Sequence, residues 1–206
     1  TRVLRDEPHG DILVFLPGVG EIKRCLERLE HVQTASVLPL YSALDTAAQD
    51  RAFATDGGRK VILATNIAET SITLPNVTTV IDSGLARTPI FDPAAGADRL
   101  ELVPISCASA DQRAGRAGRV RSGTCIRLWT EQQQRARPAD ITPDVARIDV
   151  TPALLQVRAW SGDPDGFNWY EAPPQARRAD ADSVLRSIGA LDGDNLSPLG
   201  KILSEL

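Results

Sequence analysis

The sequence has few of the residues that build disulfide frameworks and metal centres. Its 206 residues include two histidines, three cysteines and no methionine. Cys25, Cys107 and Cys125 are odd in number and lack the C-x-x-C spacing of a zinc or redox site, so we expect small buried side chains in a reducing compartment. Because neither histidine has a candidate ligand nearby, the sequence predicts no metal site.

A membrane span and a leader are also missing. No run approaches the roughly 18 apolar residues of a membrane helix, and no charged-apolar-small leader opens the chain. We therefore expect a cytoplasmic protein without membrane contact. Since the chain begins at Thr1, contains no methionine and stops within a helical pattern, we expect it to be a piece of a longer protein.

The sequence also lacks an excess of basic residues. Its formal net charge is −4 and its pI is near 5.2, which argues against a protein coated wholesale with nucleic acid. A local basic groove on an acidic body stays compatible with these values. The length allows one large domain, or one domain and a smaller module.

Short apolar runs alternate with helical patterns over the first two thirds of the chain. Helices are expected from about Glu21 to Glu30 and after Asp45 or Thr46. The apolar runs are those of parallel strands covered on both faces: Asp11–Leu16, Ala35–Leu40, Lys60–Ala64 and Val77–Asp82. The alternation predicts an α/β fold with a parallel sheet and helices on both faces.

The pattern changes after the fourth strand. Thr88–Phe91 and Leu100–Val103 flank a turn-rich segment, which predicts a protruding β-hairpin, and Gly123–Trp129 predicts a last strand. Pro138 and Pro143 interrupt the chain, so we expect a domain boundary near residue 138. The helical patterns and the glycine-rich turn that follow fit a small winged-helix module, though not uniquely.

The segment Gln112–Arg119 carries three arginines at a three-residue spacing. On a helix begun by Ser109 or Asp111, residues three apart share one face and would form a cationic ridge, with no acidic residue spaced to neutralise it. Arginine grips phosphate oxygens with a planar fork and stays charged at physiological pH. The arginines of this ridge are Arg113, Arg116 and Arg119.

Two glycines in the same segment decide between its two interpretations. Each interior glycine costs a helix about 1 kcal/mol relative to alanine, and a solvated basic helix gains nothing from Gly115 and Gly118. Both are explained if another backbone or a phosphate comes close. The segment is therefore interpreted first as a phosphate-facing helix and second as a solvated one.

Four loops are expected at the carboxyl ends of the strands, where ligands gather in an open parallel sheet. Backbone N–H groups and small polar side chains at helix starts suit the binding of phosphates without reading bases. The alternative is that Thr65, Ser42 and Ser71 only cap helices. The loops are Pro17–Gly20, Tyr41–Asp45, Thr65–Ser71 and the approach to Gln112.

Several of these segments together resemble the DEAH-box ATP-dependent RNA helicases. Ala64–Thr73 with Val80–Gly84, and then Gln112–Arg119, resemble their motifs V and VI. Phe15–Ile22 resembles motif IV of the bacterial HrpB branch, and Asp149–Leu206 is more loosely similar to the winged-helix segment that follows it.

The resemblance implies a second RecA-like domain over residues 1–138 and a partial winged-helix, helicase-associated segment over residues 139–206. In this family ATP lies between two RecA-like domains, and the first holds the phosphate-binding loop and the DEAH box. By the same resemblance, Arg116 and Arg119 would touch the γ-phosphate, Gln112 would help place the attacking water, and Arg113 would be structural. Phe53 would stack on adenine, or is an ordinary core phenylalanine.

The resemblance also implies a path for RNA and a link between the two ligands. Ser71 would lie between ATP and RNA, and the Thr88–Val103 hairpin would help separate strands or hold RNA, unless it is a structural flap. Pro75 departs from the acidic residue that many relatives carry there. The residues expected to contact single-stranded RNA, with little sequence preference, are Pro17, Gly18, Ser42, Ala43, Thr65 and Asn66.

The sequence contains neither a Gly-x-x-x-x-Gly-Lys-Ser/Thr loop nor Asp-Glu-Ala-His, so the ligands for Mg²⁺ and the β-phosphate are expected in the missing first RecA-like domain. The chain alone is not expected to hydrolyse ATP. The resemblance implies that the parent couples ATP hydrolysis to 3′-to-5′ movement on RNA. Two alternatives stay open: a DNA helicase of superfamily 2, and a non-catalytic RecA-like binding module.

Overall fold

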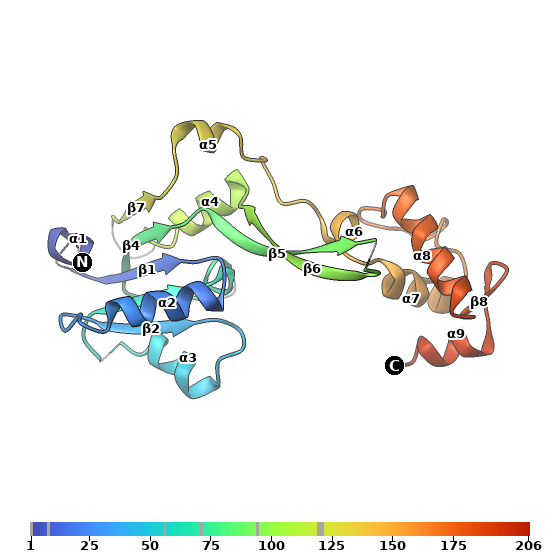
Figure 1. Ribbon diagram of the computed structural model, residues 1–206, viewed down its shortest axis with the longest axis horizontal. Helices are drawn as coiled ribbons and strands as arrows, with labels where there is room; N and C mark the ends of the chain where they lie inside the picture. The colour runs from blue at the N-terminus through green and yellow to red at the C-terminus, as the bar shows by residue number, and fades with distance from the viewer. Residues whose placement is uncertain (1, 8, 56, 71, 94, 119–121) are drawn as a thin grey trace. The chain divides into compact units, whose positions relative to one another are not determined.

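The computed structural model describes residues 2–7, 9–55, 57–70, 72–93, 95–118 and 122–206 (Figure 1). The chain divides into two compact units. The first, here called the sheet unit, comprises Thr1–Thr88 and Leu102–Ile141. The second, here called the helical unit, comprises Pro89–Glu101 and Thr142–Leu206. The assignment of residues 1–138 to a second RecA-like domain and of residues 139–206 to a partial winged-helix, helicase-associated segment stays a prediction.

The sheet unit contains a five-stranded sheet in the order β2-β3-β1-β4-β7, and all neighbouring strands are parallel. Its strands are β1 (Asp11–Phe15), β2 (Ser36–Leu40), β3 (Lys60–Ala64), β4 (Val77–Asp82) and β7 (Thr124–Arg127). Their last residues pair in one row, so the carboxyl ends of all five strands form one edge. That row is Leu40, Ala64, Phe15, Asp82 and Arg127.

Helices cover both faces of this sheet, as the sequence predicts. Alternate residues of a strand point to opposite faces, so Leu13 and Phe15 join one apolar cluster while Ile12 joins another. The helix α2 packs on the second cluster (Figure 1). The helix α3, the 3₁₀ helix η1 and Ala117, which follows α4, pack on the first. The sheet-unit helices are α1 (Arg2–Asp6), α2 (Val19–Leu29), α3 (Thr46–Phe53), η1 (Asn66–Ala68), α4 (Cys107–Ala114) and α5 (Glu131–Arg135).

The predicted hairpin is confirmed. Strands β5 (Leu85–Asp92) and β6 (Ala97–Pro104) form a two-stranded sheet of their own, longer than the sequence pattern indicates (Figure 1). Its tip belongs to the helical unit. There Arg147 Nη1 donates to the Pro89 carbonyl over 2.7 Å, and the Asp98 carboxylate accepts the Asp149 amide over 2.9 Å.

The helical unit has its own apolar core, built by α7 and α8 with the turn that follows. Leu154, Leu155 and Leu185 are buried in it, and Trp169 packs against them. Its elements are α6 (Asp144–Arg147), α7 (Thr151–Ser161), α8 (Gln175–Ser187), the antiparallel pair β8 (Leu191–Asp192) and β9 (Asn195–Leu196), and α9 (Pro198–Leu203). The winged-helix assignment stays a prediction.

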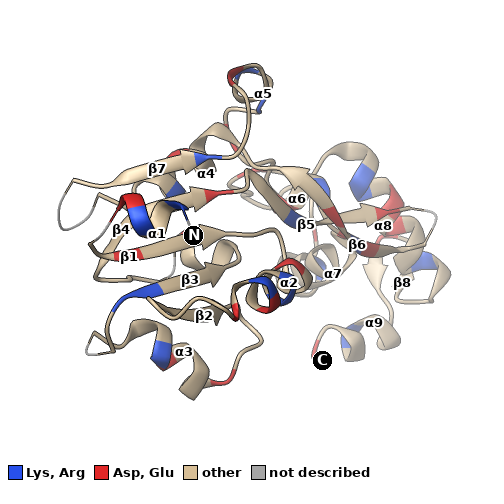
Figure 2. Cartoon of the chain, turned by 60° about the vertical axis from the view of Figure 1, so that its left-hand side comes forward, with Lys and Arg blue, Asp and Glu red and all other residues tan. Residues whose placement is uncertain are grey.

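Charged residues of both signs lie along α8, which carries Arg177, Arg178 and Arg186 with Asp180 and Asp182 (Figure 2). Such a helix presents no uniform cationic stripe to a polyanion. Among the described residues, no helix is long and apolar enough to cross a membrane.

Candidate nucleotide and nucleic-acid site

The residues predicted to contact RNA follow three adjacent strands. Pro17-Gly18 follows β1, Ser42-Ala43 follows β2 and Thr65-Asn66 follows β3, and these strands are neighbours in the order β2-β3-β1. Two main-chain hydrogen bonds tie the loops together beyond the strands: Leu16 N donates to Ala64 O over 2.8 Å, and Thr65 N donates to Leu40 O over 3.2 Å. The structure therefore brings all three loops to one edge of the sheet.

These loop residues differ in exposure. Ser42, Ala43 and Asn66 are exposed and Thr65 is half-buried, whereas Pro17 and Gly18 are buried. A polyanion approaching from solvent would therefore meet the loops after β2 and β3 first.

The side chain of Arg87 covers Gly18. A Cβ atom at Gly18 would lie 2.8 Å from Arg87 Nε, so glycine is what allows this approach. Arg87 Nη2 also lies 3.4 Å from Glu21 Oε1, which Arg24 contacts at 2.7 Å. Burial tends to raise the pKa of Glu21, but a main-chain hydrogen bond and the charges of Arg87 and Arg24 bring it below its ordinary value. Sequence reasoning missed Arg87, because the contact joins residues far apart in the chain.

The prediction of one cationic ridge over Gln112–Arg119 is wrong. The helix α4 begins after Ser106, whose side chain accepts the Ser109 amide over 3.1 Å, and it ends at Ala114. Residues 115–118 form turns, in which Arg116 N donates to Arg113 O over 3.1 Å. Glycines 115 and 118 favour such an end, and tighter bonds over three residues often close a helix. Arg119 lies outside the described residues.

Arg113 is buried and neutralised, contrary to the expectation for a ridge. Its Nε lies 2.9 Å from Glu69 Oε2, its Nη1 lies 2.9 Å from Asp82 Oδ1, and its guanidinium stacks 4.7 Å from the centre of the Phe15 ring. The arginine is 1% exposed. These contacts give Arg113 the structural role expected of it. The acidic partners were missed because they come from other elements than α4.

Arg116 is held against the loop that follows β3. Its Nη1 donates to Ile72 O over 2.8 Å and its Nη2 donates to Glu69 O, and the residue is 9% exposed. Gln112 lies four residues earlier and is exposed. Of the predicted nucleotide-contacting residues, Arg116 is therefore in contact with the loop that carries Thr65 and Asn66.

Phe53 is the last residue of α3 and is half-buried against the apolar cluster that contains Ala52 and Ile62. This contact agrees with a core role, and its stacking on adenine stays a prediction.

An added Cβ atom at Gly118 would meet no described neighbour within 4 Å. No described residue therefore explains that glycine by close approach. Ser71 lies outside the described residues.

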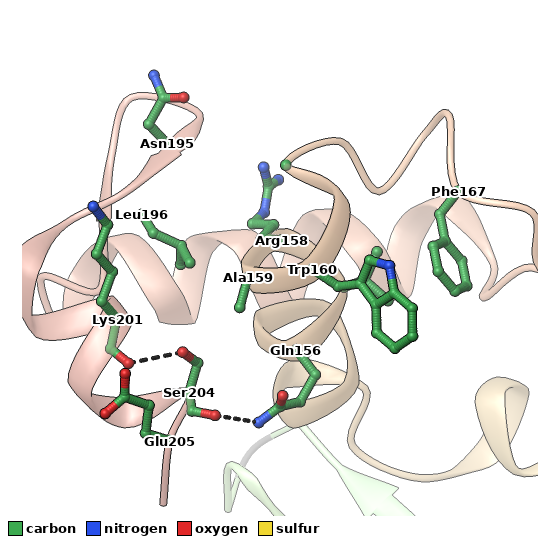
Figure 3. A pocket seen from close by; sticks show the side chains of 12 residues that line it. Gln156, Arg158, Ala159, Trp160, Phe167, Asn195, Leu196, Lys201, Ser204 and Glu205 are labelled. Atoms are coloured by element: carbon green, nitrogen blue, oxygen red, sulfur yellow. Dashed lines mark hydrogen bonds between the residues drawn. The ribbon is translucent and has the colours of Figure 1, made fainter.

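The helical unit contains a groove of about 780 Å³ (Figure 3). Trp160, which is 88% exposed, and Phe167 lie on one side of it, and Lys201 lies on the other. Gln156 Nε2 donates to Ser204 O across its floor over 2.8 Å. Among the described residues, none of those predicted to bind ATP or RNA lines this groove.

Comparisons with known proteins agree with the resemblance of the sequence motifs to those of RNA helicases. The family model of the helicase conserved C-terminal domain matches residues 1–121. The chain is 40% identical to the ATP-dependent RNA helicase HrpA of Escherichia coli over 212 residues, which are 98% of this chain and 16% of HrpA. It is 44% identical to the human probable ATP-dependent RNA helicase DHX34 over 208 residues, which are 97% of this chain and 18% of DHX34.

A solved structure extends the likeness to the backbone. The crystal structure of Escherichia coli DEAH/RHA helicase HrpB superposes with a TM-score of 0.90 at 39% identity, covering 97% of this chain and 26% of that chain. This chain thus spans about a sixth to a quarter of the length of these proteins. With the family model matching more than half of its residues, the chain belongs to the helicase conserved C-terminal domain family, and it is similar over nearly its whole length to the ATP-dependent RNA helicases HrpA and HrpB.

Proposed function

We propose that this chain is the second RecA-like domain, with part of the helicase-associated region, of an ATP-dependent RNA helicase. It contributes arginine fingers to ATP and backbone contacts to single-stranded RNA. The observation that carries the proposal is the position of Arg116, whose guanidinium is held by the main chain of the loop that begins with Thr65 and Asn66. One loop thus adjoins residues assigned to both ligands.

Helix α4 and the turns at residues 115–118 that follow it suit a nucleotide phosphate presented from outside the chain. An arginine that stabilises a transferring phosphoryl group must be oriented before reaction, and two carbonyl oxygens hold the terminal nitrogens of Arg116. Gln112 is exposed nearby and can orient a water, and Arg119 and Ser71 complete the proposed nucleotide set with Phe53. When bound, ATP with Mg²⁺ supplies the phosphoryl group whose hydrolysis drives movement.

The metal ligands belong to the missing first RecA-like domain in this proposal. Among the described residues, no three His, Cys, Asp or Glu side chains are gathered so that they could hold a metal ion. The second domain then supplies cations and the first supplies the phosphate-binding loop, so neither is sufficient for turnover. We expect the isolated chain to show no RNA-stimulated ATP hydrolysis.

The RNA side of the proposal uses the loops after β1, β2 and β3. Backbone N–H groups and small polar side chains at the carboxyl edge can hold sugar and phosphate without reading bases, which explains binding by a chain of net charge −4. The residues are Pro17, Gly18, Ser42, Ala43, Thr65 and Asn66. The cytoplasm of a bacterium is the proposed location.

Substrate preference separates this proposal from a DNA helicase of superfamily 2. The full-length parent should be assayed for ATP hydrolysis with single-stranded RNA and with DNA of the same sequence. We expect RNA to stimulate the rate and DNA to stimulate it much less. Greater stimulation by DNA would overturn the RNA assignment while leaving the helicase family intact.

Arg116→Ala in the full-length parent separates catalysis from a non-catalytic binding module. Because a cation at the transferring phosphoryl group is worth about 10³–10⁵ in rate, the turnover number should fall by at least about 10³-fold. Arg135→Ala is a matched control, since its side chain is 83% exposed on α5. An unchanged rate in Arg116→Ala would favour the binding module.

A further inference from the structure

The root of the β5–β6 hairpin is held by a side chain from the segment that follows β7. This hairpin root, defined as Gly84–Thr88 with Leu102–Ile105, belongs entirely to the sheet unit. Arg137 Nη1 donates to the Gly84 carbonyl over 2.9 Å and to the Ile105 carbonyl over 2.8 Å. Because Gly84 precedes β5 and Ile105 follows β6, one guanidinium ties both strands at their base.

An indole ring completes this contact. The Arg137 guanidinium lies 4.2 Å from the centre of the Trp129 ring, and Trp129 Nε1 donates to Gln134 Oε1 over 2.7 Å. Gly84 has a φ of +71°, and an added Cβ atom there would lie 2.3 Å from Arg137 Nη2 and 2.5 Å from Trp129 Cε3. Glycine is therefore required at this position both for its backbone conformation and for the close approach. Trp129 and Arg137 are here called the root clasp.

The main chain that follows Arg137 is fixed to the start of α4. Cys107 N donates to the Pro138 carbonyl over 2.8 Å. Ala108 N donates to the Ala139 carbonyl over 3.0 Å. Both amides belong to the first turn of α4, where amides have no acceptor within the helix. The root clasp is therefore a fixed support for the hairpin root.

The same root contacts the loop that is proposed to hold RNA. Arg87 lies in the root, three residues after Gly84, and its side chain covers Gly18. Its Nη2 also lies 3.4 Å from Oε1 of Glu21, in the first turn of α2. Through Arg87, the position of the root therefore sets the surroundings of Pro17 and Gly18 at the carboxyl end of β1.

We propose that Trp129 and Arg137 are positioning residues that hold the hairpin root where the loop after β1 can receive the sugar-phosphate backbone of single-stranded RNA. This inference rests on the proposed function, which assigns RNA to Pro17 and Gly18. The root clasp is not catalytic, because it acts only through the main chain of the root. Its loss weakens RNA binding but leaves the contacts of Arg116 in place, so the RNA-saturated enzyme still hydrolyses ATP.

The test uses the full-length parent with ATP and single-stranded oligouridylate RNA. Arg137→Met keeps a long flexible side chain but removes the donors to both carbonyls. The RNA concentration that gives half-maximal stimulation of ATP hydrolysis should rise by about fivefold, the lower end of a typical coupling between two sites. The hydrolysis rate at saturating RNA should change much less.

Arg137→Lys keeps the charge but replaces the planar fork by a single ammonium group. It should raise the half-maximal RNA concentration less than Arg137→Met does, and it serves if the methionine variant does not fold.

Arg59→Met is the matched control. Arg59 is also a half-buried arginine that donates to main-chain carbonyls, those of Gly10 and Leu4, each over 2.8 Å. It directly precedes β3 and so lies at the amino edge of the sheet, opposite the RNA loops. Its loss should lower stability without raising the half-maximal RNA concentration.

Each outcome decides. A half-maximal concentration unchanged in folded Arg137→Met or, where that variant does not fold, in Arg137→Lys overturns the positioning role alone. An equal rise in Arg59→Met overturns it as an effect of general destabilisation. A lower rate at saturating RNA without a rise in that concentration overturns it by placing the effect at the nucleotide. A wild-type parent without RNA-stimulated hydrolysis overturns the proposed function and the positioning role with it.

Discussion

The two edges of the parallel sheet both bury charged side chains, but they use them differently. At the amino edge, Lys60 Nζ lies 3.7 Å from Asp11 Oδ2 and also donates to the carbonyls of Ala52, over 3.0 Å, and Ala54 at the end of α3. At the carboxyl edge, Arg113 bridges Glu69 and Asp82. One cation thus faces one carboxylate at the amino edge and two at the carboxyl edge.

The difference lies in what the charges connect. Lys60 joins two strands to the end of one helix, where a cation also favours the helix carbonyls. Arg113, on α4, joins Glu69 in the segment that follows β3 to Asp82, the last residue of β4. Loops at the carboxyl ends of parallel strands are where ligands bind. The amino edge therefore stabilises the sheet, and the carboxyl edge positions loops.

The largest effect expected from this comparison is that of Arg113→Met. The variant leaves Glu69 and Asp82 buried without their cation, and breaking a buried pair in this way costs about 3–5 kcal/mol. Urea denaturation of the 206-residue chain measures the loss. Lys60→Met should cost less, about 1–3 kcal/mol, because Asp11 still accepts the main-chain amide of residue 60 over 2.8 Å. A greater loss for Lys60→Met would contradict the comparison.

The strands could be predicted from the sequence because each satisfies a local rule. Lys60–Ala64 is buried along its whole length and reads as one apolar run after its first residue. The sequence predicts the hairpin but makes its two strands too short, because their outer residues are partly polar and carry no apolar pattern.

From the sequence, the arrangement of the candidate site can be predicted only where it depends on the ends of the strands. The three loops at the carboxyl edge follow from the parallel order, whereas the partners of Arg113 and the contact between Arg87 and Gly18 depend on tertiary approach. The prediction of a cationic ridge over Gln112–Arg119 is wrong because residues three apart share one face only while the helix continues. Here it ends at Ala114.

An intermediate loss of stability is expected at the amino edge from Gly123→Ala. A Cβ atom there would lie 2.0 Å from the Ala117 carbonyl oxygen and 2.7 Å from that of Thr78, both of which are backbone. Overpacking of this kind costs about 1–3 kcal/mol, because the strand β7 must move away from its neighbour. Thermal and urea denaturation of the chain measure it.

Gly118→Ala is the matched control for that substitution. It meets no described neighbour within 4 Å, so the stability of the isolated chain should change by no more than about 0.5 kcal/mol. In the full-length parent the same variant should lower ATP hydrolysis if the first domain approaches Gly118. Full activity together with unchanged stability would show that no close approach requires this glycine.

A small loss of stability is also expected from Asp111→Asn, which removes an exposed ion pair at the carboxyl edge. Asp111 Oδ1 lies 2.6 Å from Arg127 Nη2, but its side chain is 75% exposed, so water and salt screen the attraction. Burial tends to lower the pKa of Arg127, and the hydrogen bond and charge of Asp111 raise it above its ordinary value. The variant should cost about 0.2–1 kcal/mol, and the difference should shrink as salt is added. A loss as large as that of Arg113→Met would mean that exposed charges, and not the buried bridge, hold the carboxyl edge together.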